Sequence, residues 1–122
     1  MNQVKTVLAL ISGIWLLAPN AVSAQASRPL PLTQPKAANL TRMRAELLNR
    51  GLGQYRAASC MYEIQAGFCF ESISDQGFQF LFQGGAPGWQ QQTPPNPTIE
   101  TSVLVSRDGD RILEVSYNGT IR

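Results

Sequence analysis

The chain has 122 residues with 10 basic and 8 acidic side chains, a formal net charge of +2, and therefore one domain at most. The basic residues are scattered, which argues against a nucleic-acid partner or an anionic membrane partner. Histidine is absent, so His-based triads and His-containing metal sites are excluded, and two cysteines alone cannot complete a zinc site or an iron–sulfur cluster. We expect no metal and no cofactor.

Residues 1–24 have the three parts of a secretory signal peptide. Lys5 gives a weakly positive start, residues 7–18 form an apolar stretch, and residues 22–24 (Val-Ser-Ala) predict cleavage before Gln25. The alternative is an uncleaved membrane anchor, but the apolar stretch is well short of the ~20 residues that span a bilayer. We therefore predict an exported protein, periplasmic or extracellular, whose mature form has no stable membrane insertion.

Residues 25–37 are predicted to form a Pro-rich flexible tether, because Pro29, Pro31 and Pro35 occur among polar residues. A single folded domain is expected over residues 38–122. It should begin with a helix that is N-capped by Asn39 and runs to about Asn49. The expected buried face consists of Leu40, Met43, Leu47 and Leu48, which recur at helical spacing.

After Ala58 the apolar residues alternate with polar ones, the pattern of strands with one buried face. The alternating apolar residues are Cys60, Tyr62 and Ile64; Phe68 and Phe70; Phe78, Phe80 and Phe82; Ile99, Val103 and Val105; and Leu113, Val115 and Tyr117. Turn residues at 75–77 and 107–110 separate neighbouring runs. The predicted fold class is α+β, with one N-terminal helix packed on a four- to five-stranded antiparallel sheet.

Cys60 and Cys69 enclose eight residues, a span that suits two adjacent strands of a hairpin. An oxidising compartment favours a disulfide between them, and closing so short a loop would stabilise the fold by roughly 3 kcal/mol. The alternative is a redox-active thiol pair. Such pairs usually form a C-x-x-C motif at the N-terminus of a helix, and this spacing does not match one.

The segment Gly84–Pro97 reads GGAPGWQQQTPPNP, and loops this long without internal structure are usually functional or disordered. Trp89 is its only large apolar side chain. One interpretation has Trp89 folded back over the edge of the sheet, and the other makes it a contact residue for a protein or a carbohydrate. On the second interpretation the candidate binding residues are Trp89, Gly85, Pro87 and Gln90.

Acidic residues offer weaker candidates. Asp108 and Asp110 supply far fewer oxygen ligands than calcium requires, so a hairpin turn is favoured there. Four glutamates could in principle support carboxylate-based catalysis, but the sequence indicates no apolar enclosure that would separate their pKa values. They are Glu63, Glu71, Glu100 and Glu114.

Three stretches together resemble a group of short exported proteins of cyanobacteria: NLTRMRAELLNRGLGQYRAASCMYE, GGAPGW after the Phe-rich strand, and SRDGDRILEVSYNGTIR. The resemblance covers roughly residues 38–122 and implies a bacterial periplasmic or extracellular setting, with no established activity, cofactor or catalytic residue. The order of elements is also similar to the cystatin-like arrangement, although the inhibitor's Gln-x-Val-x-Gly loop is absent.

The leading functional hypothesis is a non-catalytic binding module that presents the Gly84–Pro97 loop to a protein or a glycan. It rests on the missing catalytic groups, on Trp89 and on the Pro-rich tether. The alternatives are a protease-inhibitor-like or envelope structural protein and, with less support, a carboxylate-based enzyme.

Overall fold

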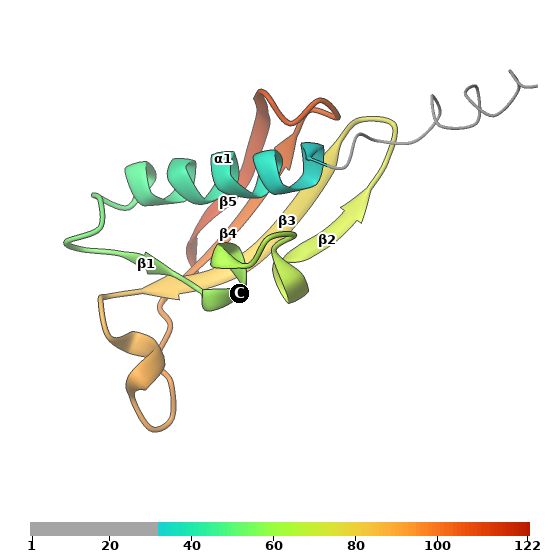
Figure 1. Ribbon diagram of the computed structural model, residues 1–122. Helices are drawn as coiled ribbons and strands as arrows, with labels where there is room; N and C mark the ends of the chain where they lie inside the picture. The colour runs from blue at the N-terminus through green and yellow to red at the C-terminus, as the bar shows by residue number, and fades with distance from the viewer. Residues whose placement is uncertain (1–31) are drawn as a thin grey trace, which may run out of the picture.

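A computed structural model describes residues 32–122, so the predicted signal peptide and most of the predicted tether lie outside the described residues. One helix, α1 (Thr33–Leu48), lies across one face of a five-stranded antiparallel sheet (Figure 1). The strands are β1 (Arg56–Ala57), β2 (Phe70–Ile73), β3 (Phe78–Gly85), β4 (Ile99–Val105) and β5 (Ile112–Thr120). The predicted α+β fold class is confirmed.

The helix begins six residues before Asn39, so the tether prediction is wrong for its last five residues, Thr33 to Ala37. Pro35 is compatible with this start because it lies in the first turn. The first helical hydrogen bond runs to the carbonyl of the N-cap residue from the fourth helical residue, and here Lys36 N donates to Leu32 O (3.1 Å). No helical hydrogen bond is lost at Pro35.

The buried face of α1 also differs from the prediction. Met43, Leu47 and Leu48 are exposed, while Leu40 is only partly buried. The residues that face the sheet are small and recur mainly every fourth position: Thr33, Ala37, Ala38, Thr41 and Ala45. The sheet side of the core already holds Phe78, Phe80 and Phe82, and small helix residues allow the backbone of α1 to approach these rings.

The sheet order is β1-β3-β4-β5, and β2 pairs with the other end of β3. The predicted alternation holds along β3 and β4, where Phe80 lies opposite Val103 and both are fully buried. It fails in β5, because two register shifts leave Leu113 exposed and set Tyr117 opposite Ser102 on the sheet face away from α1. Val115 packs against the core as predicted, and Ile112 packs there although it was not predicted to.

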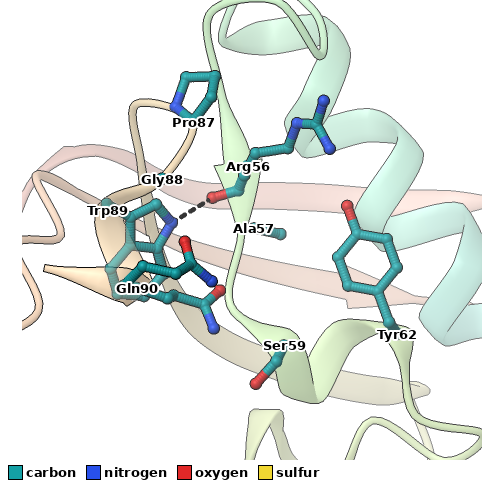
Figure 2. A pocket seen from close by; sticks show the side chains of 9 residues that line it. Arg56, Ala57, Ser59, Tyr62, Pro87, Gly88, Trp89 and Gln90 are labelled. Atoms are coloured by element: carbon teal, nitrogen blue, oxygen red, sulfur yellow. Dashed lines mark hydrogen bonds between the residues drawn. The ribbon is translucent and has the colours of Figure 1, made fainter.

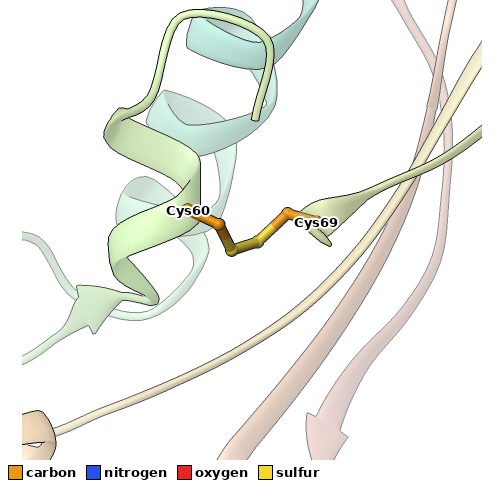
Figure 3. Close-up of a disulfide and its surroundings, with 2 residues drawn as sticks. All are labelled: Cys60 and Cys69. Atoms are coloured by element: carbon orange, nitrogen blue, oxygen red, sulfur yellow. A yellow bond between two sulfur atoms is a disulfide. The ribbon is translucent and has the colours of Figure 1, made fainter. Parts of the chain in front are cut away.

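The disulfide between Cys60 and Cys69 is present, as predicted, with the two Cα atoms 5.8 Å apart (Figure 3). The strand predicted to run from Cys60 to Ile64 is not. Two short 3-10 helices, η3 (Ser59–Tyr62) and η4 (Gly67–Cys69), carry the cysteines instead. The alternation of apolar residues was misleading here, because Met61 and Ala66 point into the core while the residues between them face solvent.

Two hydroxyl groups in the core lack hydrogen-bond partners among the described residues: those of Thr41 on α1 and of Tyr55, just before β1. The Tyr55 ring lies against Gly84, where any side chain would collide with it. The nearby Thr101 hydroxyl donates to Asn118 Oδ1 (2.7 Å), and the Tyr55 oxygen makes no hydrogen bond of normal geometry. Burial raises the pKa of Tyr55 to about 12.

Candidate functional site

The candidate site lies where β1 meets the first half of the Gly84–Pro97 loop. β1 pairs with the last two residues of β3, so that Arg56 lies opposite Gly85 and Ala57 opposite Gly84. The loop leaves the sheet at this point and projects beyond it as a separate lobe (Figure 1). Thr98 N donates to Gly84 O (2.9 Å) and closes the base of the lobe.

The loop is internally ordered, contrary to the expectation of a segment without structure. It contains a 3-10 helix, η5 (Trp89–Gln91), and Asn96 N donates to Trp89 O (3.1 Å). Trp89 is only 6% exposed, packs against Gly85, and donates from its indole Nε1 to Arg56 O (2.8 Å). Of the two interpretations of Trp89, the structure has the ring folded back over the edge of the sheet, where it fastens the loop to β1.

A solvent-open pocket of about 470 Å³ lies beside this anchor (Figure 2). Its lining residues are Arg56, Ala57, Ser59, Tyr62, Pro87, Gly88, Trp89, Gln90 and Gln91. Three of the four candidate binding residues, Pro87, Trp89 and Gln90, therefore share one pocket. Gly85 does not line it and lies behind the Trp89 ring.

Arg56 gives the pocket its positive charge. Its Nε donates to Leu52 O (3.0 Å), and no described carboxylate forms an ion pair with its guanidinium. In Figure 2 the Trp89 and Gln90 side chains lie on one side of β1, and the Arg56 side chain reaches toward Tyr62 on the other. The terminal nitrogens of this guanidinium are thus open to an anionic ligand.

Tyr62 forms the opposite wall and is held by α1. Its hydroxyl donates to Glu46 Oε2 (3.4 Å), and the Arg42 guanidinium lies over its ring, 4.8 Å from the centroid. Arg42 in turn pairs with Glu46 (3.3 Å). Burial raises the pKa of Tyr62, and the negative Glu46 carboxylate raises it further, so this hydroxyl stays protonated at neutral pH.

Sequence reasoning missed Arg56, Ser59 and Tyr62. Of these, only Tyr62 had a predicted place, in the strand from Cys60 to Ile64. The three were missed because only the pairing of β1 with the far end of β3 brings residues 56–62 beside residues 87–91. The one local signal was an isolated arginine, Arg56, followed by two alanines, and this pattern is not specific for a binding site.

The acidic residues do not line the pocket described above or a second cavity. A second cavity, of about 410 Å³, is lined by Leu48, Asn49, Arg50, Gln54 and Ile99. Neither cavity is lined by a carboxylate, and Glu100 is engaged in an ion pair with Arg122 (3.0 Å). Within residues 32–122, no group of three or more His, Cys, Asp or Glu is arranged to hold a metal ion.

None of the described helices is long and apolar enough to cross a membrane. Comparisons with protein-family models, with curated proteins and with solved structures found no match to this chain. The cyanobacterial resemblance therefore stays an expectation.

Proposed function

We propose that this protein is a non-catalytic binding module that holds a carboxylate-bearing saccharide in the pocket lined by residues 56–62 and by residues 87–91 of the Gly84–Pro97 loop. The observation that carries the proposal is Arg56, which lines the pocket and whose guanidinium has no carboxylate partner among the described residues; its side chain reaches toward Tyr62, another lining residue. Arginine binds carboxylates through paired, charge-assisted hydrogen bonds, which are about twice as strong as neutral ones.

The other polar groups suit sugar hydroxyls. Gln90 and Gln91 each offer an amide with two donors and one acceptor oxygen, and Ser59 adds a hydroxyl. Tyr62 is 53% exposed and is held in place from α1, so its ring can contact the apolar face of a sugar. The volume is within the range of small-molecule sites, about 300–1,000 Å³.

A saccharide suits this lining better than a peptide does. Peptide-binding grooves offer an open strand edge or apolar pockets for anchor side chains. Here the edge strand β1 has only two residues, too few to pair with an extended peptide, and the apolar lining is limited to Ala57, Pro87, Trp89 and the Tyr62 ring. The absence of a carboxylate from the lining supports binding over acid–base catalysis.

We place this activity outside the cytoplasm. The disulfide is the supporting observation, because such bonds persist mainly in oxidising compartments. The predicted signal peptide agrees with that setting but lies outside the described residues. Recovery of the processed chain, beginning at Gln25, from a periplasmic or culture fraction would support export. Recovery of the intact chain with reduced thiols from the cytosol would overturn it.

The binding proposal is tested first with an array of acidic and neutral oligosaccharides. We expect binding to carboxylate-bearing saccharides only. Isothermal titration then compares the best acidic saccharide with its methyl ester, which removes the charge and keeps the ring. The ester should bind at least about tenfold more weakly, the size expected for a hydrogen bond to a charged group.

Arg56→Gln should weaken binding of the acid by a similar factor and leave binding of the ester nearly unchanged. Arg44→Gln is the matched control, since Arg44 is an exposed arginine that does not line the pocket. Equal affinity for acid and ester, or equal losses in the two variants, would contradict the proposal.

A further inference from the structure

The loop closed by the disulfide, residues 61–68, carries two large apolar side chains with almost no contacts. Phe68 is 100% exposed and Ile64 is 78% exposed. Between them, Ala66 is fully buried. The loop is therefore fixed to the core at its centre and presents an apolar side chain on either side of this fixed point.

Hydrogen bonds tie this loop to itself and to α1. Cys69 N donates to Ala66 O (2.7 Å), Ala66 N donates to Glu63 O (3.1 Å), and Gln34 on α1 donates to Gln65 O (3.0 Å). Together with the disulfide, these contacts hold Ile64 and Phe68 in position before any partner arrives. Such preorganisation lowers the entropic cost of association.

The loop and the strand that follows it carry only acidic charges of their own. No lysine or arginine occurs in residues 57–106, whereas Glu63 lies in the loop and Glu71 follows it on β2. Two basic side chains lie near Tyr62, at the start of the loop: Arg42, which is paired with Glu46, and Arg56 of the saccharide pocket. Ile64 and Phe68 are thus apolar side chains beside acidic ones.

We propose that Ile64 and Phe68 form a docking surface for a second protein, one that offers an apolar pocket with lysine or arginine at its rim. Charge complementarity favours this occupant. A twofold contact with a second copy would bring Glu63 and Glu71 against their own counterparts. An anionic lipid surface would repel the same carboxylates, and no basic residue of the loop offsets this repulsion.

The test places a photo-crosslinking phenylalanine analogue at position 68, and separately at position 47, in the full chain expressed in its native host. Leu47 is the matched control because it is also a large apolar residue, 76% exposed, on the outer side of α1. We expect one discrete protein adduct from position 68 and none from position 47. The captured protein is then purified and its affinity for the wild-type chain is measured directly.

Phe68→Ala should weaken that affinity by about 30-fold or more, as expected for an anchor residue, and Leu47→Ala should leave it unchanged. Replacing Glu63 and Glu71 by glutamine should slow association at low salt and flatten its salt dependence. Because Phe68 makes almost no contacts, its removal should not change the thermal midpoint, which separates lost docking from lost folding.

Any of three other outcomes would overturn the proposal. They are an adduct formed only with a second copy of the chain, flotation with phosphatidylglycerol vesicles that depends on Phe68, or no adduct in the native host. Saccharide binding by the Phe68→Ala variant is measured in parallel. It tests the pocket independently of the docking surface.

Discussion

Replacing Trp89 tests whether it anchors the loop, as its burial indicates, or contacts a ligand. The ring is 6% exposed and its Nε1 donates to Arg56 O. Trp89→Phe keeps most of the packing and removes the hydrogen bond, which leaves the Arg56 carbonyl unpaired. We expect a loss of about 1.5 kcal/mol in the free energy of unfolding. Trp89→Ala also removes the ring, and the expected loss rises to about 3–5 kcal/mol.

Thermal unfolding followed by circular dichroism measures both changes. For a domain of this size, 1 kcal/mol corresponds to roughly 4–8 °C, so Trp89→Phe should lower the midpoint by about 6–12 °C and Trp89→Ala by considerably more. Arg56→Gln is the control, because its side chain is exposed and its carbonyl is retained. It should unfold within a few degrees of the wild-type chain.

Fluorescence gives an independent measurement. Trp15 and Trp89 are the only tryptophans, so Trp89 is the sole one in a chain that begins at Gln25. Its emission should be poorly quenched by acrylamide until the chain unfolds. If Trp89→Ala unfolded at the wild-type temperature and Trp89 were quenched as readily in the native as in the denatured chain, the anchor role would be wrong.

Three further predictions concern the core and the disulfide. Replacing Cys60 and Cys69 together by serine opens a loop of eight residues, and equilibrium denaturation should show a loss of roughly 2.5–3 kcal/mol; an unchanged free energy would mean that the loop is ordered without the bridge. Because the pKa of Tyr55 is raised in the folded state, the unfolded chain loses this proton first as the pH rises. The stability contributed by Tyr55 is therefore complete below about pH 10, and the free energy of unfolding should fall between about pH 10 and 12. Denaturation of the Tyr55→Phe variant should not show this fall. If the free energy of unfolding fell equally with pH in both chains, another group would be responsible. Thr41→Val puts a methyl group in place of a fully buried hydroxyl that has no described partner. It should raise the free energy of unfolding by up to about 1 kcal/mol. A clear loss of stability would show that this hydroxyl has a hydrogen-bond partner.

The parts of the fold that the sequence predicted well are those governed by local pattern. Phe78, Phe80 and Phe82 alternate because one face of β3 is buried, and the predicted turn residues lie between the paired strands β2–β3 and β4–β5. The cysteine pairing followed from proximity and compartment. These features depend on residues close together in the chain.

The errors have a different origin. In α1, the helical spacing of the leucines and Met43 predicted the wrong buried face. The phenylalanines of the sheet occupy most of the core, so that the face of α1 with small residues, mainly alanines, packs against them. The bulges of β5 reverse the faces of Leu113 and Tyr117 without any local sign. The alternation at Cys60–Ile64 has the period of a strand, although the disulfide-closed segment forms 3-10 turns.

Of the candidate site, the sequence singled out the loop but not Arg56. The Gly84–Pro97 loop stood out by composition, and three of its four candidate residues line the pocket. Arg56, which supplies the charge, lies about thirty residues earlier and joins the loop only through the pairing of β1 with Gly84 and Gly85. No periodicity in the sequence encodes that contact.

The most direct test of the binding proposal is a titration of the ¹⁵N-labelled protein, followed by NMR, with the best acidic saccharide from the array. The backbone amides of residues 56–62 and 88–91 should shift, saturably, and the shifts should be lost in Arg56→Gln. If the shifts fell on the open face of the sheet or on α1, or if the methyl ester produced them equally well, the pocket would not be the site.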